Sequence, residues 1–153
     1  MKAVLLPVDE VRRCAGDARF AAEMELLYSE LAAEIAARRP VCVNRGACCR
    51  FGEYGHRLYV TPAEVAYFLA RSGGAVRSPD GSDACPYQQG GRCTARDGRP
   101  SGCRIFFCDP RARDWQPGLS EEVLQRLRDL HARFRLPYTY LEWFEALRQA
   151  AAV

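Results

Sequence analysis

The cysteines constrain this chain more than any other residue type does. Seven of the eight lie between positions 42 and 108, in three groups: Cys42, Cys48 and Cys49, then Cys85 and Cys93, then Cys103 and Cys108. Adjacent residues such as Cys48 and Cys49 do not easily form a disulfide with each other. Each sulfur therefore needs a partner elsewhere in the chain, or a metal ion.

The segment 78–110 carries four of these cysteines and has little else to hold it in place. It is rich in glycine and proline and poor in apolar side chains. Ordering about thirty residues costs roughly 1–2 kcal/mol each in backbone entropy, which the small apolar contacts of protonated thiols would not offset. Zinc held by four thiolates supplies on the order of 10 kcal/mol. The magnitudes favour a metal site with the seven cysteines as its candidate ligands.

The cellular compartment bears on whether these thiols are oxidised. The N-terminal sequence MKAVLLPVDEVRR has an apolar run of about six residues, shorter than the roughly 7–15 residues of a signal-peptide core. No window approaches the ~18 apolar residues of a membrane span. We therefore expect a cytoplasmic protein without a membrane partner. Because cytoplasmic thiols are kept reduced, disulfides are the poorer explanation of the cysteines.

Composition is compatible with one domain that has a moderate core. The chain has 153 residues, of which 48% are hydrophobic, and a formal net charge of +3. This length fits a single domain. Its arginines are scattered among acidic residues and form no stripe, which argues against a nucleic-acid-binding surface.

Two helices are predicted in the first half of the chain. Asp17 can cap a helix that runs to about Arg39, and an apolar stripe recurs along it at steps of three and four residues. The stripe consists of Phe20, Met24, Leu27, Tyr28, Leu31 and Ile35. Thr61 and Glu64 form a capping box for a second helix, which ends near Gly73. A short strand is predicted just before it, at 57–60.

The C-terminal part predicts a pair of helices. The first begins at Ser120 and ends before Pro137, and the second starts from a capping box formed by Thr139 and Glu142. The short link between them favours an antiparallel pair. We therefore predict a mainly α, small single domain of three to four helices packed around an irregular, cysteine-rich metal-binding segment. Its parts are an N-terminal helix within 1–40, a cysteine-cluster region at 41–110 and the helical pair at 114–150.

Four short motifs sharpen the metal hypothesis. They are CVNRGACC, TPAEV, CPYQQGGRC and RPSGCRIFFC, in this order between residues 42 and 108. Together they resemble the YkgJ-type cysteine-cluster family, which is described as a zinc- or iron-chelating domain. The family pattern joins Gly-x-Cys-Cys, a Thr/Ser-Pro-x-Glu helix start, Cys-Pro with a further Cys, and Arg-Pro-x-x-Cys-Arg-x-Phe. Many members carry an extra cysteine where this chain has Arg45, so the site has one ligand fewer or that cysteine is dispensable.

The resemblance implies metal chelation and leaves the metal and its ligand set open. One site of four cysteines would leave three thiols over, and two sites would share a thiolate or recruit His56. The leading hypothesis is a non-enzymatic protein whose thiolate-ligated zinc has a largely structural or metal-handling role, with a protein partner possible. The alternative is an iron–sulfur protein in electron transfer or attached to a modifying enzyme. A third hypothesis is a catalytic zinc or reactive-thiol enzyme, for which the sequence supplies no identifiable base beside a nucleophile.

Other polar residues near the motifs have simpler interpretations. His131 is expected on the solvent-exposed face of its helix, and Cys14, remote from the cluster, is expected to be a buried or terminal free thiol. Arg99 and Arg104 flank cysteines. They are predicted either to donate hydrogen bonds to thiolate sulfurs or to form ordinary salt bridges.

Overall fold

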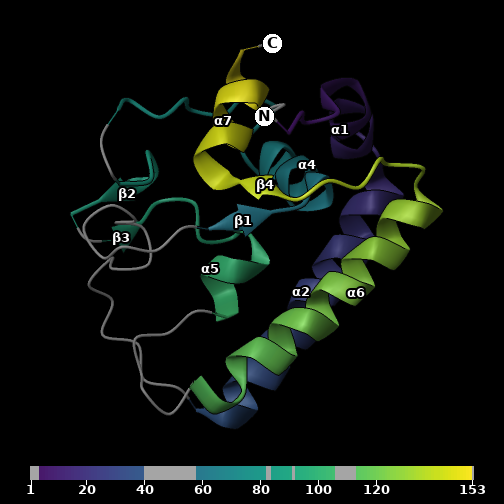
Figure 1. Ribbon diagram of the computed structural model, residues 1–153, viewed down its shortest axis with the longest axis vertical. Helices are drawn as coiled ribbons and strands as arrows, with labels where there is room; N and C mark the ends of the chain where they lie inside the picture. The colour runs from purple at the N-terminus through teal and green to yellow at the C-terminus, as the bar shows by residue number, and fades with distance from the viewer. Residues whose placement is uncertain (1–3, 40–57, 82–83, 91, 106–112, 153) are drawn as a thin grey trace.

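The computed structural model describes residues 4–39, 58–81, 84–90, 92–105 and 113–152 (Figure 1). Its elements, in chain order, are α1 (Val8–Ala15), α2 (Ala18–Arg38), β1 (Tyr59–Val60), α4 (Pro62–Arg71), β2 (Gln88–Gln89), β3 (Arg92–Cys93), α5 (Ser101–Ile105), α6 (Gln116–Arg133), β4 (Leu141–Glu142) and α7 (Trp143–Ala151). Within these ranges the chain is mainly helical, as predicted. The short helices α1 and α5 add to the three or four that were expected.

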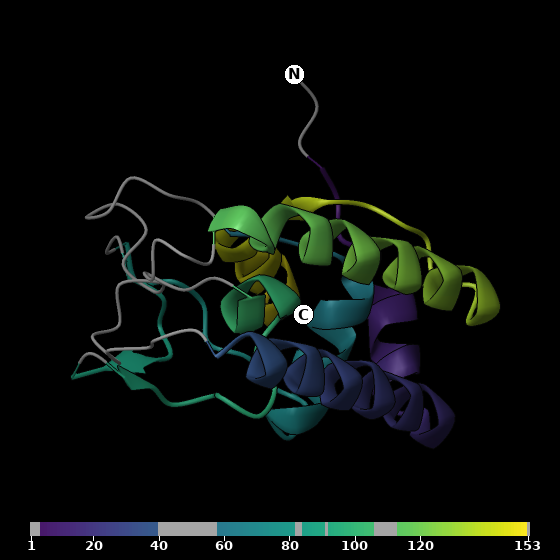
Figure 2. The same ribbon diagram turned by 90° about the horizontal axis from the view of Figure 1, so that it is seen from below.

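The two longest helices, α2 and α6, run antiparallel (Figure 1). Arg126 of α6 forms an ion pair with Glu30 of α2, with 2.9 Å between nitrogen and oxygen. The ring of Phe134 meets Phe20 edge to face, with 5.5 Å between centroids. Both α4 and α5 contact this pair and lie in the angle between the two helices (Figure 2). The antiparallel neighbour of α6 is thus α2, whereas the sequence predicted the last helix.

Helix α2 matches its predicted bounds and its predicted apolar stripe. Asp17 is its N-cap, because the side chain accepts hydrogen bonds from the backbone N–H groups of Arg19 and Phe20. Five of the six stripe residues are buried, and Ile35 is partly buried against the same core. The periodicity identified this element because its buried face is continuous over the whole helix.

Helix α6 begins four residues earlier than predicted. It starts at Gln116, not at Ser120, and has Pro117 in its first turn. Proline is compatible with this position because the first N–H groups of a helix have no partner within the helix. The side-chain amide of Gln116 donates a hydrogen bond of 3.0 Å to the carbonyl of Ile105 at the end of α5. This contact between distant segments fixes where α6 begins.

A two-stranded antiparallel bridge brings the starts of α4 and α7 together. Tyr59 pairs with Glu142 and Val60 pairs with Leu141. The backbone N–H of Trp143 also donates to the carbonyl of Leu58 at 2.8 Å. The predicted strand at 57–60 is therefore present as β1, and β4 supplies its partner. Helix α4 is almost wholly buried, since every residue from Pro62 to Leu69 is buried.

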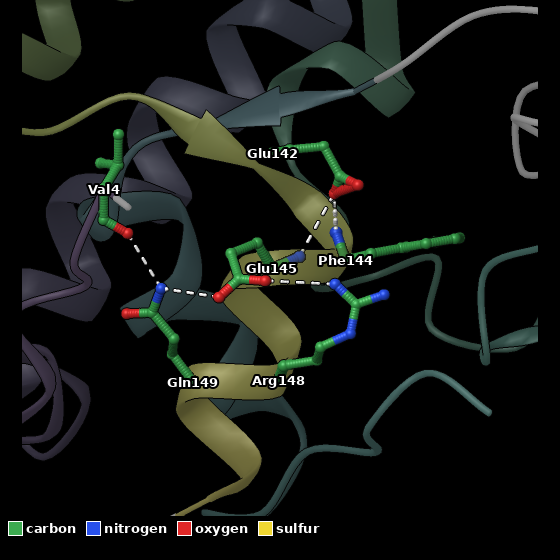
Figure 3. A network of polar contacts seen from close by, with 6 residues as sticks. All are labelled: Val4, Glu142, Phe144, Glu145, Arg148 and Gln149. Atoms are coloured by element: carbon green, nitrogen blue, oxygen red, sulfur yellow. Dashed lines mark hydrogen bonds and ion pairs between the residues drawn. The ribbon is translucent and has the colours of Figure 1, made fainter. Parts of the chain in front are cut away.

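The start of α7 differs from the predicted capping box. Glu142 is the N-cap itself, and its carboxylate accepts hydrogen bonds from the backbone N–H groups of Phe144 and Glu145 (Figure 3). The hydroxyl of Thr139, the residue predicted as N-cap, is buried without a hydrogen-bond partner. Strand β4 occupies Leu141–Glu142, so the helix cannot begin until after it.

The N-terminal segment is attached to α7 by one glutamine. The amide nitrogen of Gln149 donates to the carbonyl of Val4 at 2.9 Å (Figure 3), and its amide oxygen accepts from the backbone N–H of Leu6 at 2.6 Å. Arg148 and Glu145 form an ion pair on the same helix. Because Leu6 is buried, these two hydrogen bonds hold the segment before α1 against the core.

His131 is buried, which corrects the expectation of a solvent-exposed histidine. Only 2% of its surface is accessible. Its Nε2 accepts a hydrogen bond of 3.1 Å from the backbone N–H of Ala63, and its Nδ1 lies 2.7 Å from the carbonyl of Leu127. A neutral imidazole with the proton on Nδ1 satisfies both contacts. His131 therefore joins α6 to the first turn of α4.

We expect His131 to make folding sensitive to mild acid. Burial lowers the pKa of its imidazole, so the unfolded chain takes up this proton at a higher pH than the folded chain. Stability should fall as pH decreases below about 6.5, with a slope of at most about 1.4 kcal/mol per pH unit from this group. Urea unfolding between pH 7.5 and 5.5 measures this change in the free energy of unfolding, with His131→Gln as the matched variant. Equal pH slopes for the two proteins would contradict this assignment.

The described elements share one core and form a small single domain. Its largest fully buried side chains come from α2, α4, α6 and α7, and they include Phe20, Phe68, Leu127 and Trp143. Among the helices that the structure describes, none combines the length and apolar character needed to cross a membrane.

Candidate metal centre

Three of the seven predicted ligands lie in the described part of the chain. Cys85 precedes β2, Cys93 is on β3 and Cys103 is in α5. The other predicted site residues lie outside the described residues: Cys42, Cys48, Cys49, Cys108 and the candidate ligand His56. The structure therefore places three of the seven candidate ligands.

Cys85 and Cys93 belong to the two arms of one hairpin. Strands β2 and β3 pair antiparallel, with Gln88 opposite Cys93. The N–H of Gln88 donates to the carbonyl of Cys85 at 2.9 Å, which closes a turn just before β2. Gly90 has a φ of +57°, a left-handed conformation that glycine adopts without strain. Local turn chemistry thus brings these two segments of the CPYQQGGRC motif alongside each other.

The sulfur of Cys85 accepts a hydrogen bond from a buried tryptophan. The indole N–H of Trp143 lies 3.4 Å from Cys85 Sγ. Both residues are buried, and the indole nitrogen is a donor only, so the sulfur is the acceptor. N–H groups directed at sulfur stabilise the thiolate form and are a common feature of metal–thiolate sites. The sequence gives no signal for this contact, because the two residues are 58 positions apart.

Glu64 connects two of the four sequence motifs. One carboxylate oxygen accepts from the N–H and hydroxyl of Thr61, at 2.8 and 3.2 Å. The other accepts from the N–H and hydroxyl of Ser101, at 2.8 and 2.5 Å. The capping box of TPAEV was predicted, and it is present. Its second role is to hold the start of α5, which carries Cys103 of the RPSGC motif.

The ionisation of Glu64 reflects two opposing effects. The residue is 1% exposed, and burial raises its pKa, while the hydrogen bonds from Ser101 and Thr61 lower it. The N–H and hydroxyl groups of Thr61 and Ser101 can all act as donors, which suits a carboxylate. Burial is the larger effect, so the pKa of Glu64 lies above its usual value. A buried carboxyl group with this many hydrogen bonds is a rigid junction, since any shift leaves a polar group without a partner.

Helix α5 packs closely on the strand before α4. A Cβ built on Gly102 would lie 2.3 Å from Cδ1 of Leu58, so glycine allows the close approach between them. The N–H of Cys103 donates to the carbonyl of Pro100 at 3.1 Å. These contacts hold the backbone around Cys103 in place.

Arg104, predicted to donate to thiolate sulfurs or to form a salt bridge, has other contacts among the described residues. Its guanidinium donates to the carbonyls of Arg99 and Asp97, each at 2.8 Å. It also lies over the ring of Tyr28, with Cζ 3.8 Å from the centroid. Within the described residues its hydrogen bonds go to backbone carbonyls and its guanidinium packs on an aromatic face.

Cys14 is a buried free thiol, one of the two alternatives expected. It is 2% exposed on α1 and belongs to the hydrophobic core. Burial raises the pKa of its thiol, and the neighbouring Arg13 opposes this effect in part. A protonated core thiol acts as a small apolar side chain, so Cys14 serves as an internal reference for the other cysteines.

The described residues do not form a metal site by themselves. Within the ranges that the structure describes, no group of three or more His, Cys, Asp or Glu side chains is arranged to hold a metal ion. A shared site for the seven cysteines stays a prediction. Comparisons with protein-family models, with curated proteins and with solved structures found no match.

Proposed function

We propose that this chain is a non-enzymatic metal-binding protein of the YkgJ-type cysteine-cluster family, in which thiolates hold zinc in a largely structural or metal-handling role. The observation that carries the proposal is the concentration of seven cysteines between 42 and 108 in a segment with few apolar side chains. The candidate ligands are Cys42, Cys48, Cys49, Cys85, Cys93, Cys103 and Cys108. Zinc prefers such sulfur donors and commonly takes four of them.

Two contacts support this proposal from the protein side. The indole of Trp143 donates to the sulfur of Cys85, which favours a sulfur carrying negative charge. Glu64 holds the segment of Cys103 against α4. Groups around a metal site that orient its ligands in this way raise metal affinity. The bound ion would supply the ordering free energy that the apolar side chains of 78–110 do not.

The hydrogen bond from Trp143 to Cys85 is also compatible with an iron–sulfur cluster, which is the second candidate. N–H groups directed at cysteine sulfurs are one of the factors that set the reduction potential of such clusters. In this alternative the protein would transfer electrons or serve an attached modifying enzyme. Cytoplasmic location and the presence of a protein partner belong to both proposals.

Metal analysis of anaerobically purified protein tests the proposal. We expect at least one zinc per chain and no visible colour, whereas the broad visible absorption of an iron–sulfur cluster would favour the second candidate. Replacement of Cys85, Cys93 and Cys103 together by alanine should remove bound metal, because three candidate ligands are lost. Cys14→Ala is the matched control and should retain it. Metal-free wild-type protein, or equal metal content in both variants, would contradict the proposal.

A further inference from the structure

A cavity of about 310 Å³ lies between the C-terminal half of α2 and the segment that contains α5. Its lining residues are Tyr28, Ala32, Ile35, Ala36, Arg39, Arg99 and Arg104. The polar groups of these side chains can all donate hydrogen bonds, and none of the described lining residues is acidic. We propose that this cavity binds a small oxyanion, a phosphate or a carboxylate group of a metabolite-sized molecule.

Among the described residues, no acidic side chain pairs with the arginines of the cavity. The acceptors of Arg104 among the described residues are backbone carbonyls, which leave its charge intact. Nε of Arg99 is buried without a hydrogen-bond partner. Among the ion pairs between described residues, none includes Arg39, Arg99 or Arg104. Arg99 and Arg104 are partly buried, whereas Arg39 is exposed. Partly buried guanidinium groups that lie close together are stabilised by an anion that joins them.

Tyr28 adds a buried donor that points to the same conclusion. The residue is 4% exposed, and its hydroxyl has no hydrogen-bond partner. Burial raises the pKa of Tyr28 well above 10, so the hydroxyl keeps its proton and can donate. The face of its ring is covered by Arg104. Buried polar groups in folded proteins are nearly always satisfied, and an oxyanion in this cavity would accept from both Tyr28 and Arg99.

Within the described part of the chain, neither Glu64 nor the end of α2 takes the place of a ligand. Glu64 acts electrostatically on Tyr28, but both its oxygens accept hydrogen bonds from Thr61 and Ser101. The C-terminal end of α2 contributes about half a negative charge through its dipole. That is too little for the three arginines.

The shape of the cavity indicates the class of ligand. One wall is apolar and is formed by Ala32, Ile35 and Ala36, which suits a short carbon chain. The volume is at the lower end of the 300–1,000 Å³ typical of small-molecule sites. Planar guanidinium groups bind phosphate and carboxylate oxygens in pairs. A phosphate monoester and a short dicarboxylate share this oxyanion chemistry, and binding measurements separate them.

Calorimetric titration of the full-length protein, with inorganic phosphate and with succinate as probes, tests the proposal. We expect saturable binding of at least one of the two. Arg99→Gln should weaken it about 10- to 100-fold, since a hydrogen bond to a charged group is lost. Tyr28→Phe should weaken it by a smaller factor, about tenfold. Binding of phosphate alone identifies a phosphorylated ligand, and binding of succinate alone identifies a carboxylate.

Two controls keep the outcome unambiguous. Arg77→Gln alters an arginine of a different cleft, beside Tyr87 and Cys93, and should leave binding unchanged. Tyr28→Phe removes a hydroxyl that has no hydrogen-bond partner. In the absence of anion, the unfolding midpoint of this variant should therefore not fall below that of the wild type. Its affinity for the anion should fall. Absence of binding by both probes, or equal weakening by Arg77→Gln and Arg99→Gln, overturns the proposal. Neither result bears on metal content, so the test is independent of the metal proposal.

Discussion

Replacement of Glu64 by alanine is expected to lower the free energy of unfolding by about 4 kcal/mol. The side chain accepts four hydrogen bonds, two from Thr61 and two from Ser101. Its loss leaves two buried backbone N–H groups without an acceptor, at about 1–3 kcal/mol each. It also leaves a cavity between α4 and α5. Urea unfolding followed by circular dichroism measures the change.

Two further variants test whether the effect arises from this junction. Glu64→Gln keeps the size of the side chain and one acceptor oxygen, so we expect a loss of about 2 kcal/mol. Glu121→Ala removes an exposed glutamate from α6 and should change stability by less than about 0.5 kcal/mol. If Glu64→Ala were no more destabilising than Glu121→Ala, Glu64 would not be the link that holds α5 in place.

Removal of the proposed metal is expected to have a still larger effect. Structural zinc in small domains contributes on the order of 10 kcal/mol, comparable to the roughly 5–15 kcal/mol of total stability of a domain. Metal-free protein should therefore lose ordered structure around the cysteines. Trp143 is a local reporter because its indole contacts Cys85. In a Trp115→Phe background, chelation should shift Trp143 emission to longer wavelength, together with a loss of far-ultraviolet dichroism.

Reversal by metal separates this effect from damage to the protein. Addition of zinc to the chelated sample should restore both signals, whereas magnesium should not, because it prefers oxygen ligands. Cys14→Ala should respond to chelation as the wild type does, since Cys14 is a residue of α1 that lies in the hydrophobic core. Unchanged dichroism and unchanged Trp143 emission after complete metal removal would exclude a structural role for the ion.

The sequence predicted the elements whose signals are local. Asp17 and the capping box of Thr61 and Glu64 mark the starts of α2 and α4, because a cap acts on the N–H groups two or three residues away. Boundaries set by contacts between distant segments were missed. Gln116 starts α6 by reaching Ile105, and β4 delays α7 until Glu142 by pairing with β1.

The candidate metal centre also has features that the sequence predicts and features that only the tertiary structure supplies. The identity and spacing of the cysteines, and the lack of apolar residues around them, are properties of the sequence alone and are sufficient to predict a metal site. Three hydrogen bonds join residues that are far apart in the chain. They run from Trp143 to Cys85, from Ser101 to Glu64 and from Ala63 to His131. Capping and periodicity act over a few residues, whereas these contacts exist only once the helices pack and exclude water. That packing also gathers Tyr28, Arg99 and Arg104 around one cavity.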